Sequence, residues 1–478
     1  MHQPKRSIIW FRQDLRIHDN EALCQALGNS EEVIPVFIFD PRTLLGKTNF
    51  GFQKTGKFRT RFILESVADL RDSLRALGSE LYIRIGKPEE ILFDIANTYK
   101  TSWVFCNRER TREEVDVQDA LERKLWTIGQ EMRYTRGKML YYTSDLPFPI
   151  THTPDVFTQF RKEVERVVSV RMPMETPLAV PRLSSKMEAG DMPTLEDFGH
   201  EYFEWDSRAT LSFKGGEREG LKRLQYYLWE SNLAASYKET RNGMLGGDYS
   251  TKFSPWLAMG CLSPKLIYSE LKAYEAEQGA NESTYWIFVE LLWRDFFRLM
   301  GKKYGDSIFL KGGTKGLTDS PLEEDWDRMQ LWMTGQTGIP FIDANMKEIN
   351  TTGFMSNRGR QNVASFLIKD LKVNWQMGAE YFESLLIDYD VMSNWGNWNY
   401  LAGVGSDPRE DRYFNILNQA RRYDSKGEYI KTWLPELAEL PAEKIHIPDT
   451  LSTPEQENWH VILGNDYPNA IVRSEIWN

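Results

Sequence analysis

The stretch LLIDYDVMSNWGNWNYLAGVG, residues 385–405, sets the main requirement on how the C-terminal part of this chain folds. Two carboxylates, Asp388 and Asp390, interrupt an apolar run, and amide and indole side chains follow at once. A charge is expensive to bury unless it is paired or hydrogen-bonded. The stretch therefore predicts a buried polar site that must find its partners elsewhere in the chain.

Two interpretations of these carboxylates stay open from the residues alone. Paired carboxylates are typical of acid–base catalysis, although no His, Ser or Cys nearby completes a nucleophile arrangement. In the alternative, one carboxylate pairs with an arginine such as Arg360, and the other accepts hydrogen bonds from a buried ligand. Asn394 would then offer an amide that hydrogen-bonds but neither takes nor gives a proton.

Length and composition are typical of a soluble globular protein. The chain has 478 residues, of which 41% are hydrophobic and 27% charged, and this length favours two domains or more. No apolar run reaches the ~18 residues that span a bilayer, and the N-terminus lacks the hydrophobic region of a signal peptide. We therefore expect a cytoplasmic monomer without a membrane segment.

Metal and disulfide chemistry are not indicated. The three cysteines lie far apart and form no CxxC motif, and the six histidines are scattered. We expect reduced thiols and no metal site.

The charge and the aromatic content bear on possible ligands. A net charge of −10 argues against a surface coated with nucleic acid, because phosphate binding depends on Lys and Arg, but it leaves room for a local basic groove. Twelve of the sixteen tryptophans follow residue 220. Indoles either fill cores or stack on flat ligands and nucleobases, and composition alone does not choose between these roles.

The first third of the chain, residues 1–140, alternates strand and helix patterns. This order predicts an α/β domain with a parallel, Rossmann-like sheet. The amphipathic segment KFRTRFILESVADLRDSLRALG predicts a helix that stops at Gly78. No GxGxxG or Walker sequence follows any strand, so the usual phosphate-binding fingerprints are missing. The predicted strands are Ser7–Phe11, Val33–Phe39, Leu81–Ile85 and Trp103–Cys106, and the further helices are Pro88–Tyr99 and Arg112–Ile128.

Residues 141–218 are interpreted as a long connector, because proline recurs there and strand alternation disappears. One helix is predicted within it, Pro154–Val167, with proline at its first position. Residues 219–478 carry helical signals and predict an all-α domain. Ser254 and Ser263, each followed by proline, are predicted N-caps.

Two buried helices are predicted in the all-α domain. The segment NESTYWIFVELLWRDFFRLMGKK is apolar around nearly its whole circumference, so the charges within it need partners, and Glu290 and Arg294 are spaced to pair at i, i+4. The second buried helix runs roughly over Gln361–Leu371. Polar groups inside an apolar helical domain indicate a bound ligand.

Two further segments carry possible anion-binding chemistry. In GGDYSTKFSPW, residues 246–256, hydroxyls, backbone amides and a lysine precede a helix start, which favours an anion site; an ordinary capped loop explains them too. In NRGRQ, residues 357–361, two arginines could bind carboxylates or phosphates bidentately. A solvated helix start is the alternative there.

Several long motifs resemble the photolyase/cryptochrome family, and most of all its cryptochrome DASH branch. The resemblance covers essentially the whole chain. It implies an α/β antenna domain joined by a long connector to an all-α domain that holds FAD in a U shape. The motifs are IIWFRQDLRIHDNEAL, YSTKFSPWLAMGCLSP, ELLWRDFFR, TGFMSNRGRQNVASFLIKDLKVNW, MGAEYFESLLIDYDVMSNWGNWNY and GVGSDPREDRYFNI.

The resemblance also implies a cofactor site. The family positions matched here surround the FAD diphosphate, the flavin side and the isoalloxazine edge, with Arg360 as the ion-pair partner of Asp388 and Asn394 facing flavin N5. Groups near N5 tune the electronics of a flavin. The implied cofactor residues are Tyr237, Ser250, Thr251, Lys252, Phe253, Ser254, Asn357, Arg360, Asp388, Asp390 and Asn394.

The implied activity is light-driven electron transfer from reduced FAD, which splits a cyclobutane pyrimidine dimer in UV-damaged DNA. The lesion must leave the base stack to reach the flavin, and the DASH branch implies a preference for single-stranded DNA. Glu290 and Trp293 match the residues that hydrogen-bond and pack against the damaged bases, so they join Asn394 as predicted catalytic residues. The predicted DNA contacts are Arg241, Arg294 and Arg358.

Photoreduction in the family uses three tryptophans between the flavin and the surface. Trp398 and Trp375 match the inner two, although the phase of Trp375 with Leu367 also fits a core residue. The third position falls on Leu322, and Trp326, about one helical turn on, is the candidate replacement.

An antenna is implied less directly than the flavin. Glu109 and Glu113 stand where relatives contact a folate such as methenyltetrahydrofolate, and a charged helix start explains them equally well.

Two other functions stay open on the sequence. One is a blue-light receptor that signals through a partner, and the other is a nucleic-acid-binding regulator with vestigial photochemistry. Signalling relatives often carry a long disordered tail. The residues after TWLPELAEL keep apolar and aromatic content, so we expect no such tail here.

Overall fold

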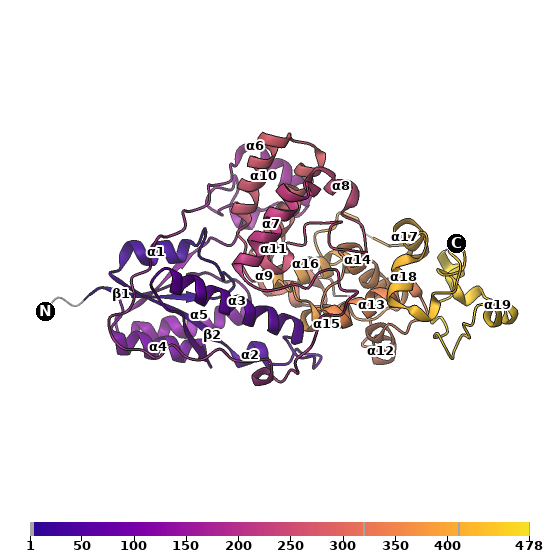
Figure 1. Ribbon diagram of the computed structural model, residues 1–478, viewed down its shortest axis with the longest axis horizontal. Helices are drawn as coiled ribbons and strands as arrows, with labels where there is room; N and C mark the ends of the chain where they lie inside the picture. The colour runs from indigo at the N-terminus through magenta and orange to yellow at the C-terminus, as the bar shows by residue number, and fades with distance from the viewer. Residues whose placement is uncertain (1–3, 319–320, 410–411, 478) are drawn as a thin grey trace.

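The computed structural model describes residues 4–318, 321–409 and 412–477. Figure 1 shows a sheet domain at the N-terminal end of the chain packed beside a larger helical domain. The sheet has five parallel strands in the order β3-β2-β1-β4-β5. The strands are β1 Arg6–Phe11, β2 Glu32–Phe39, β3 Tyr82–Ile85, β4 Trp103–Asn107 and β5 Glu131–Thr135.

Helices cover both faces of this sheet, which is why β2 is buried at all eight of its positions. Side chains of α1 and α3 pack on one face, and those of α4 and α5 pack on the other. The predicted α/β fold with a parallel sheet is therefore confirmed. The helices of this domain are α1 Glu21–Asn29, α2 Pro41–Leu44, α3 Lys57–Ala76, α4 Pro88–Tyr99 and α5 Arg112–Trp126.

Four sequence expectations differ in detail from the structure. The predicted strands omitted β5, Glu131–Thr135, and the predicted helices omitted α1 and the short α2. The connector helix α6 spans Phe157–Val167, so Pro154 is not its first residue; the backbone at Val156 is still extended (φ −104°, ψ 122°). The second buried helix starts earlier than predicted, and its C-terminal half, Phe366–Asp370, is a π-helical segment.

The C-terminal part of the chain is helical, as predicted. The long helix α11 begins at a capping box formed by Asn281 and Thr284 and contacts α8 and α16. The helices from α6 onward are α6 Phe157–Val167, α7 Glu217–Gln225, α8 Tyr237–Thr240, α9 Ser254–Ala258, α10 Pro264–Gln278, α11 Glu282–Tyr304, α12 Trp326–Thr334, α13 Pro340–Thr352, α14 Asn357–Ser365, α15 Trp375–Leu385, α16 Val391–Ala402, α17 Ile416–Tyr423, α18 Glu428–Trp433 and α19 Thr453–Asn458.

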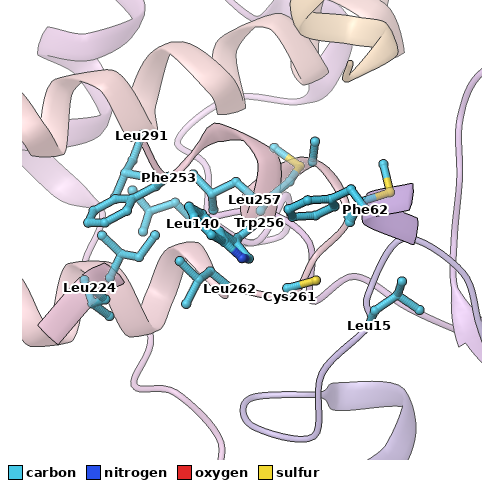
Figure 2. Close-up of a cluster of buried hydrophobic side chains, with 14 of the residues drawn as sticks. Leu15, Phe62, Leu140, Leu224, Phe253, Trp256, Leu257, Cys261, Leu262 and Leu291 are labelled. Carbon is cyan, nitrogen blue, oxygen red and sulfur yellow. The ribbon is translucent and has the colours of Figure 1, made fainter. Parts of the chain in front are cut away.

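One apolar core runs through the interface of the two domains. Leu15 and Phe62 from the sheet domain pack in one cluster with Trp256 and Leu262 of the helical domain (Figure 2). The rings of Phe62 and Trp256 meet edge to face, with centroids 6.0 Å apart. Burial of this shared surface stabilises the relative position of the two domains.

A buried ion pair also links the two domains. Asp19 of the sheet domain pairs with Lys265 of α10 at 2.7 Å, and both side chains are at most 2% exposed. Ser263 caps α10 as predicted, because its Oγ accepts from the backbone N–H groups of Lys265 and Leu266. The hydroxyl itself donates to Asp19.

No helix among the described residues combines the length and apolar character needed to cross a bilayer.

We predict that Asp19→Asn lowers the free energy of unfolding by ~3–5 kcal/mol, because it leaves the Lys265 ammonium buried without a counter-charge. Urea unfolding followed by fluorescence would measure the change. The matched control is Asp116→Asn, whose partner Arg112 is 67% exposed; exposed pairs contribute little, so its unfolding midpoint should not move. Equal shifts in both variants would contradict a role for the buried pair.

Candidate functional site

A cavity in the helical domain brings together residues from Tyr237 to Asp388, which lie 151 positions apart in the chain. It is lined from α8 and the loop after it, the N-terminal end of α9, the middle of α11, the start of α14 and the segment before α16. Most of the predicted cofactor residues lie on its wall. The predicted cofactor residues on the wall are Tyr237, Ser250, Thr251, Lys252, Phe253, Ser254, Asn357, Arg360 and Asp388. Arg241 and Glu290, which were predicted for DNA binding and catalysis, line the same cavity.

Asp388 is the anchor of this wall. Its Oδ2 accepts a hydrogen bond from Ser254 Oγ at 2.6 Å and an ion-paired one from Arg360 at 2.8 Å. The predicted pairing of Arg360 with Asp388 is therefore confirmed. The other oxygen, Oδ1, is buried and has no hydrogen-bond partner among the described residues. An orphaned carboxylate oxygen in a cavity indicates that a ligand supplies the missing donor.

Ser254 does not act as the predicted N-cap. It is the first residue of α9, the cap position is Phe253, and no side chain bonds the end of the helix. The Ser254 hydroxyl is committed to Asp388. The short helix α9 therefore positions the Ser254 side chain next to Asp388 on the cavity wall.

Lys252 supplies a second orphaned group. Its backbone is left-handed (φ +59°), its side chain is buried, and its ammonium lies over the ring of Tyr249 without a hydrogen-bond partner among the described residues. Burial lowers the pKa of the Lys252 ammonium well below its usual value. An anionic ligand group in the cavity would remove this cost by pairing with the lysine.

The start of α14 places Arg360 by local hydrogen bonds. Ser356 caps the helix by accepting from Gly359 N–H at 2.9 Å, and Arg360 Nε donates to Met355 O. A side chain at Gly359 would lie 2.0 Å from Asn345 Oδ1. Only glycine allows α13 and α14 to approach this closely.

Glu290 and Arg241 form an ion pair on the wall of the cavity, where their side chains are 39% and 27% exposed. The pairing of Glu290 with Arg294 that the sequence spacing predicted is wrong. Arg294 instead donates to the backbone carbonyls of Lys138 and Leu257, at 2.7 and 3.2 Å. Arg294 therefore bonds the chain on both sides of the domain interface, and its predicted contact with DNA stays a prediction.

Arg358 lies beside the same site. It donates to Asn242, a cavity residue, at 2.8 Å, and its guanidinium group lies 4.7 Å from the ring centroid of Tyr423. Arg241 stacks similarly on Trp286 at 4.6 Å. The two arginines therefore flank the cavity as an electropositive pair.

Asp390 is not among the residues that line the cavity, so its predicted contact with the cofactor stays a prediction. Its Oδ1 caps α16 by accepting from Ser393 N–H at 3.0 Å, and its Oδ2 pairs with Arg298. Burial would raise the pKa of the Asp390 carboxyl, but Arg298 and Arg294 outweigh it and hold that pKa well below its usual value. Each oxygen of the Asp390 carboxylate therefore already has a partner within the chain.

Two predicted catalytic residues lie outside the lining of the cavity. The amide of Asn394 donates to Ala379 O at 3.0 Å. Trp293, one turn after Glu290 on α11, stacks on Phe157 with ring centroids 3.7 Å apart and contacts Tyr400 edge to face. Their predicted roles stay predictions.

The three predicted electron-transfer tryptophans differ in exposure. Trp375 and Trp398 are buried at 0% and 2%, whereas Trp326 is 43% exposed. Leu322, which stands at the family's third position, is buried next to the chain segment that precedes Trp375.

A second cavity lies at the carboxyl ends of β1 and β4, where the strand order reverses. Ligands of open parallel sheets bind at this switch point. Glu109 lines the cavity and pairs with Lys138, whereas Glu113 does not: its side chain is 69% exposed and pairs with Lys54. The first turn of α5 directs Glu113 to the surface, so its predicted contact with an antenna stays a prediction without support from this cavity.

The sequence did not single out Arg298 or Lys138. Both line the second cavity, and Arg298 is the partner of Asp390. A signal existed in WRDFFRLM, where a second arginine follows Arg294 by four residues inside an apolar helix. No group of three or more potential His, Cys, Asp or Glu metal ligands occurs in the described part of the chain.

Comparison with known proteins identifies this arrangement. A family described as the FAD binding domain of DNA photolyase matches residues 286–476, and one described as DNA photolyase matches residues 7–181. The crystal structure of a Synechocystis sp. cryptochrome superposes with a TM-score of 0.96 at 48% identity, covering 100% of this chain and 98% of that one. A class III photolyase from Agrobacterium tumefaciens has a TM-score of 0.86 at 27% identity, covering 100% and 96%.

The fold and the cavity thus define a flavoprotein of the DNA photolyase class. Among curated proteins, the cryptochrome DASH of Gloeobacter violaceus is 52% identical over 98% of this chain and 93% of its own length. That of Synechocystis sp. is 49% identical over 98% and 96%. The chain belongs to the cryptochrome DASH branch of the photolyase/cryptochrome family.

The residues present fit FAD. The orphaned Asp388 Oδ1 accepts from a ligand N–H or O–H, as the edge of a flavin or its ribityl chain provides. The orphaned Lys252 ammonium and the hydroxyls of Ser250 and Thr251 suit a diphosphate. The cavity therefore carries suitable polar groups both for the flavin part of the cofactor and for its diphosphate.

We predict that Asp388→Asn weakens FAD binding about tenfold or more, because a hydrogen bond to a charged group contributes ~1.5–3 kcal/mol. The ratio of flavin absorbance to protein absorbance after purification, and titration of the apoprotein with FAD, would measure it. Asp343→Asn is the control, since Asp343 is equally buried but bonds Thr337 and Tyr467 away from the cavity. Normal flavin content in Asp388→Asn would refute the assignment.

Proposed function

We propose that this protein repairs cyclobutane pyrimidine dimers in DNA when its bound, reduced FAD absorbs light, with single-stranded DNA as the preferred substrate. The observation that carries the proposal is the partly exposed Glu290–Arg241 pair on the wall of the same cavity that holds Asp388. A hydrogen-bonding carboxylate beside a flavin site suits a flipped base. Family membership supports the same reaction class.

We assign roles to the chain's own residues from their positions at the cavity and, for Trp293 and Asn394, which lie outside its lining, from the resemblance to the family. Reduced FAD supplies, on absorbing light, an electron that opens the cyclobutane ring and then returns. Glu290 accepts hydrogen bonds from the damaged bases and holds them against the cavity. Arg241 and Arg358 bind the flanking phosphates, and Trp293 packs against the lesion. Asn394 keeps a non-acidic amide near the flavin, so no side chain exchanges a proton with the reacting atoms.

A preference for single strands follows from the energetics of flipping. Extruding a base from duplex DNA costs a few kcal/mol, and least when the base is already unpaired. Binding energy to offset that cost comes mainly from phosphate contacts. The chain carries a net charge of −10, and we assign only Arg241 and Arg358 to phosphates, so little binding energy is available for opening a duplex.

We further propose that residues 1–140 form the antenna domain, residues 141–218 the connector and residues 219–478 the catalytic domain of a cytoplasmic monomer. A folate, such as methenyltetrahydrofolate, is the proposed antenna at the second cavity. Glu109 and the cations Lys138, Arg298 and Lys302 line that cavity, and they suit a ligand with both amide and carboxylate groups.

A blue-light receptor is the second candidate function. It requires the same flavin and the same light absorption but no turnover of lesions. The two candidates therefore differ in one measurement, the light-dependent loss of dimers.

The experiment uses purified protein reduced chemically under anaerobic conditions and an oligonucleotide with one thymine dimer. We expect dimers to disappear under blue light and not in the dark, and faster from the single strand than from the matching duplex. Normal flavin spectra without loss of dimers from either substrate would reject repair and favour the receptor. Equal rates on both substrates would reject the strand preference alone.

We predict that Glu290→Gln lowers repair about 10- to 100-fold, because it removes a charged hydrogen bond of ~1.5–3 kcal/mol. Flavin content should be unchanged. The control is Glu282→Gln on the same helix, whose side chain is 76% exposed and pairs with Lys238 outside the cavity. If Glu290→Gln repairs at the wild-type rate, the carboxylate does not hold the lesion.

A further inference from the structure

A row of aromatic rings joins the buried Trp398 to the protein surface. The ring centroids of Trp398 and Trp332 are 6.4 Å apart, and those of Trp332 and Tyr381 are 5.9 Å apart. Tyr381 continues to Phe52 at 5.4 Å, and Phe52 to Trp326 at 6.0 Å. Trp332 is fully buried, whereas Trp326 is 43% exposed. The row therefore starts in the helical core and ends in solvent.

The other direction from the core has no such exit. The ring of Trp375 meets Trp395 at 5.7 Å, and Trp395 meets Phe309 at 5.0 Å. Within the described residues, neither contact continues to an exposed tryptophan or tyrosine ring. Leu322, whose backbone runs beside residues 372–374, has an aliphatic side chain that cannot carry an electron vacancy. By ring contacts of this kind, Trp375 therefore has no aromatic route to an exposed tryptophan within the part of the chain that the structure describes.

The hydrogen bonds of each ring decide which ring can hold the electron vacancy that oxidation leaves. Trp332 Nε1 donates to Val363 O at 3.0 Å, and a carbonyl oxygen stabilises an indole cation. Tyr381 donates its hydroxyl to Asn350 Oδ1 at 2.5 Å. A phenol must lose its proton when oxidised, and a neutral amide is not a base that takes it. Trp375 Nε1 donates to Lys311 O at the same distance, 3.0 Å, so either indole can hold a vacancy. Among the described residues, the ring contacts of Trp332 continue through Tyr381 and Phe52 to Trp326, and those of Trp375 do not.

We propose that electrons reach the flavin of this protein along Trp326, Trp332 and Trp398, with Trp332 as the intermediate carrier in place of Trp375. This inference rests on the proposed function for a light-excited flavin, and on the resemblance to the family for Trp398 as the inner donor. Trp398 gives one electron to the light-excited flavin, Trp332 refills Trp398, and Trp326 refills Trp332. The exposed Trp326 then loses its indole proton to water, and an external thiol returns one electron and one proton to it.

The test is flash photolysis of the FAD-loaded protein with oxidised flavin, reading the transient absorption of the tryptophan radical as well as flavin reduction. We expect Trp332→Phe to lower the yield of long-lived radical at least tenfold. Trp375→Phe, the matched control, should change it less than twofold, and Tyr381→Phe should leave a measurable yield. The reverse pattern, loss in Trp375→Phe and retention in Trp332→Phe, would overturn the proposal.

Two further measurements guard against a folding defect and against confusion with repair. Flavin absorbance per protein should be normal in every variant compared. Adding Leu322→Trp to Trp332→Phe should restore the radical, because it gives Trp375 a ring next to its own segment; failure to restore it in a protein with normal flavin content would overturn the assignment of Leu322 as the break. Repair by chemically reduced wild-type protein needs no internal electron supply, so it tests the proposed function separately.

The lifetime of the radical reports where the vacancy ends. Proton loss from an exposed indole to water slows in deuterated buffer, so the deprotonation phase should be solvent-isotope dependent in the wild type. Trp326→Phe should abolish that phase and shorten the lifetime, since the vacancy then remains on Trp332 and returns to the flavin. An isotope-dependent phase that survives in Trp326→Phe would place the end of the route elsewhere.

Discussion

The arrangement of the cavity depends on the buried carboxylate of Asp388, one oxygen of which has no hydrogen-bond partner among the described residues. Asp388 is 7% exposed, and two hydrogen bonds hold its Oδ2, from Ser254 and Arg360, which come from different helices. Burying this charge is tolerable only because the arginine compensates it. The pair fixes α9, α14 and the segment before α16 around a common point. Asp388 lines the cavity that these segments help to enclose, and its Oδ1 has no hydrogen-bond partner among the described residues.

The sheet domain helps to hold that point, although it contributes no residue to the cavity wall. Arg59 on α3 donates to Leu386 O at 2.9 Å, two residues before Asp388, and its guanidinium group lies 4.8 Å from the ring centroid of Tyr389. Gly56 at the start of the same helix donates its N–H to Ser384 O at 2.9 Å. The backbone around Asp388 is therefore clamped from the other domain, and the interface pair of Asp19 and Lys265 acts in the same direction.

The sequence predicted element types and one decisive contact but not most partners. Strand and helix patterns report burial by periodicity, so the sheet and α11 could be located. The Asp388–Arg360 pair was predictable because a buried carboxylate needs a cation. Partners supplied by another domain were not, since periodicity gives the face of a helix and says nothing about what covers it. For that reason Glu290 was paired with Arg294 on its own helix, when Arg241 is its partner.

The orphaned groups in the cavity link stability to the cofactor. Lys252 Nζ and Asp388 Oδ1 are both buried without partners among the described residues, and each such group costs ~1–3 kcal/mol until it is satisfied. Glu348, which accepts hydrogen bonds from Tyr429 and Thr210, is also buried, and burial raises the pKa of its carboxyl to about 7. A ligand that binds only the folded state adds its binding free energy to the stability. FAD, by pairing with the orphaned groups, removes a cost that the chain alone leaves in place, so the same atoms that select the flavin also make the native helical domain depend on it.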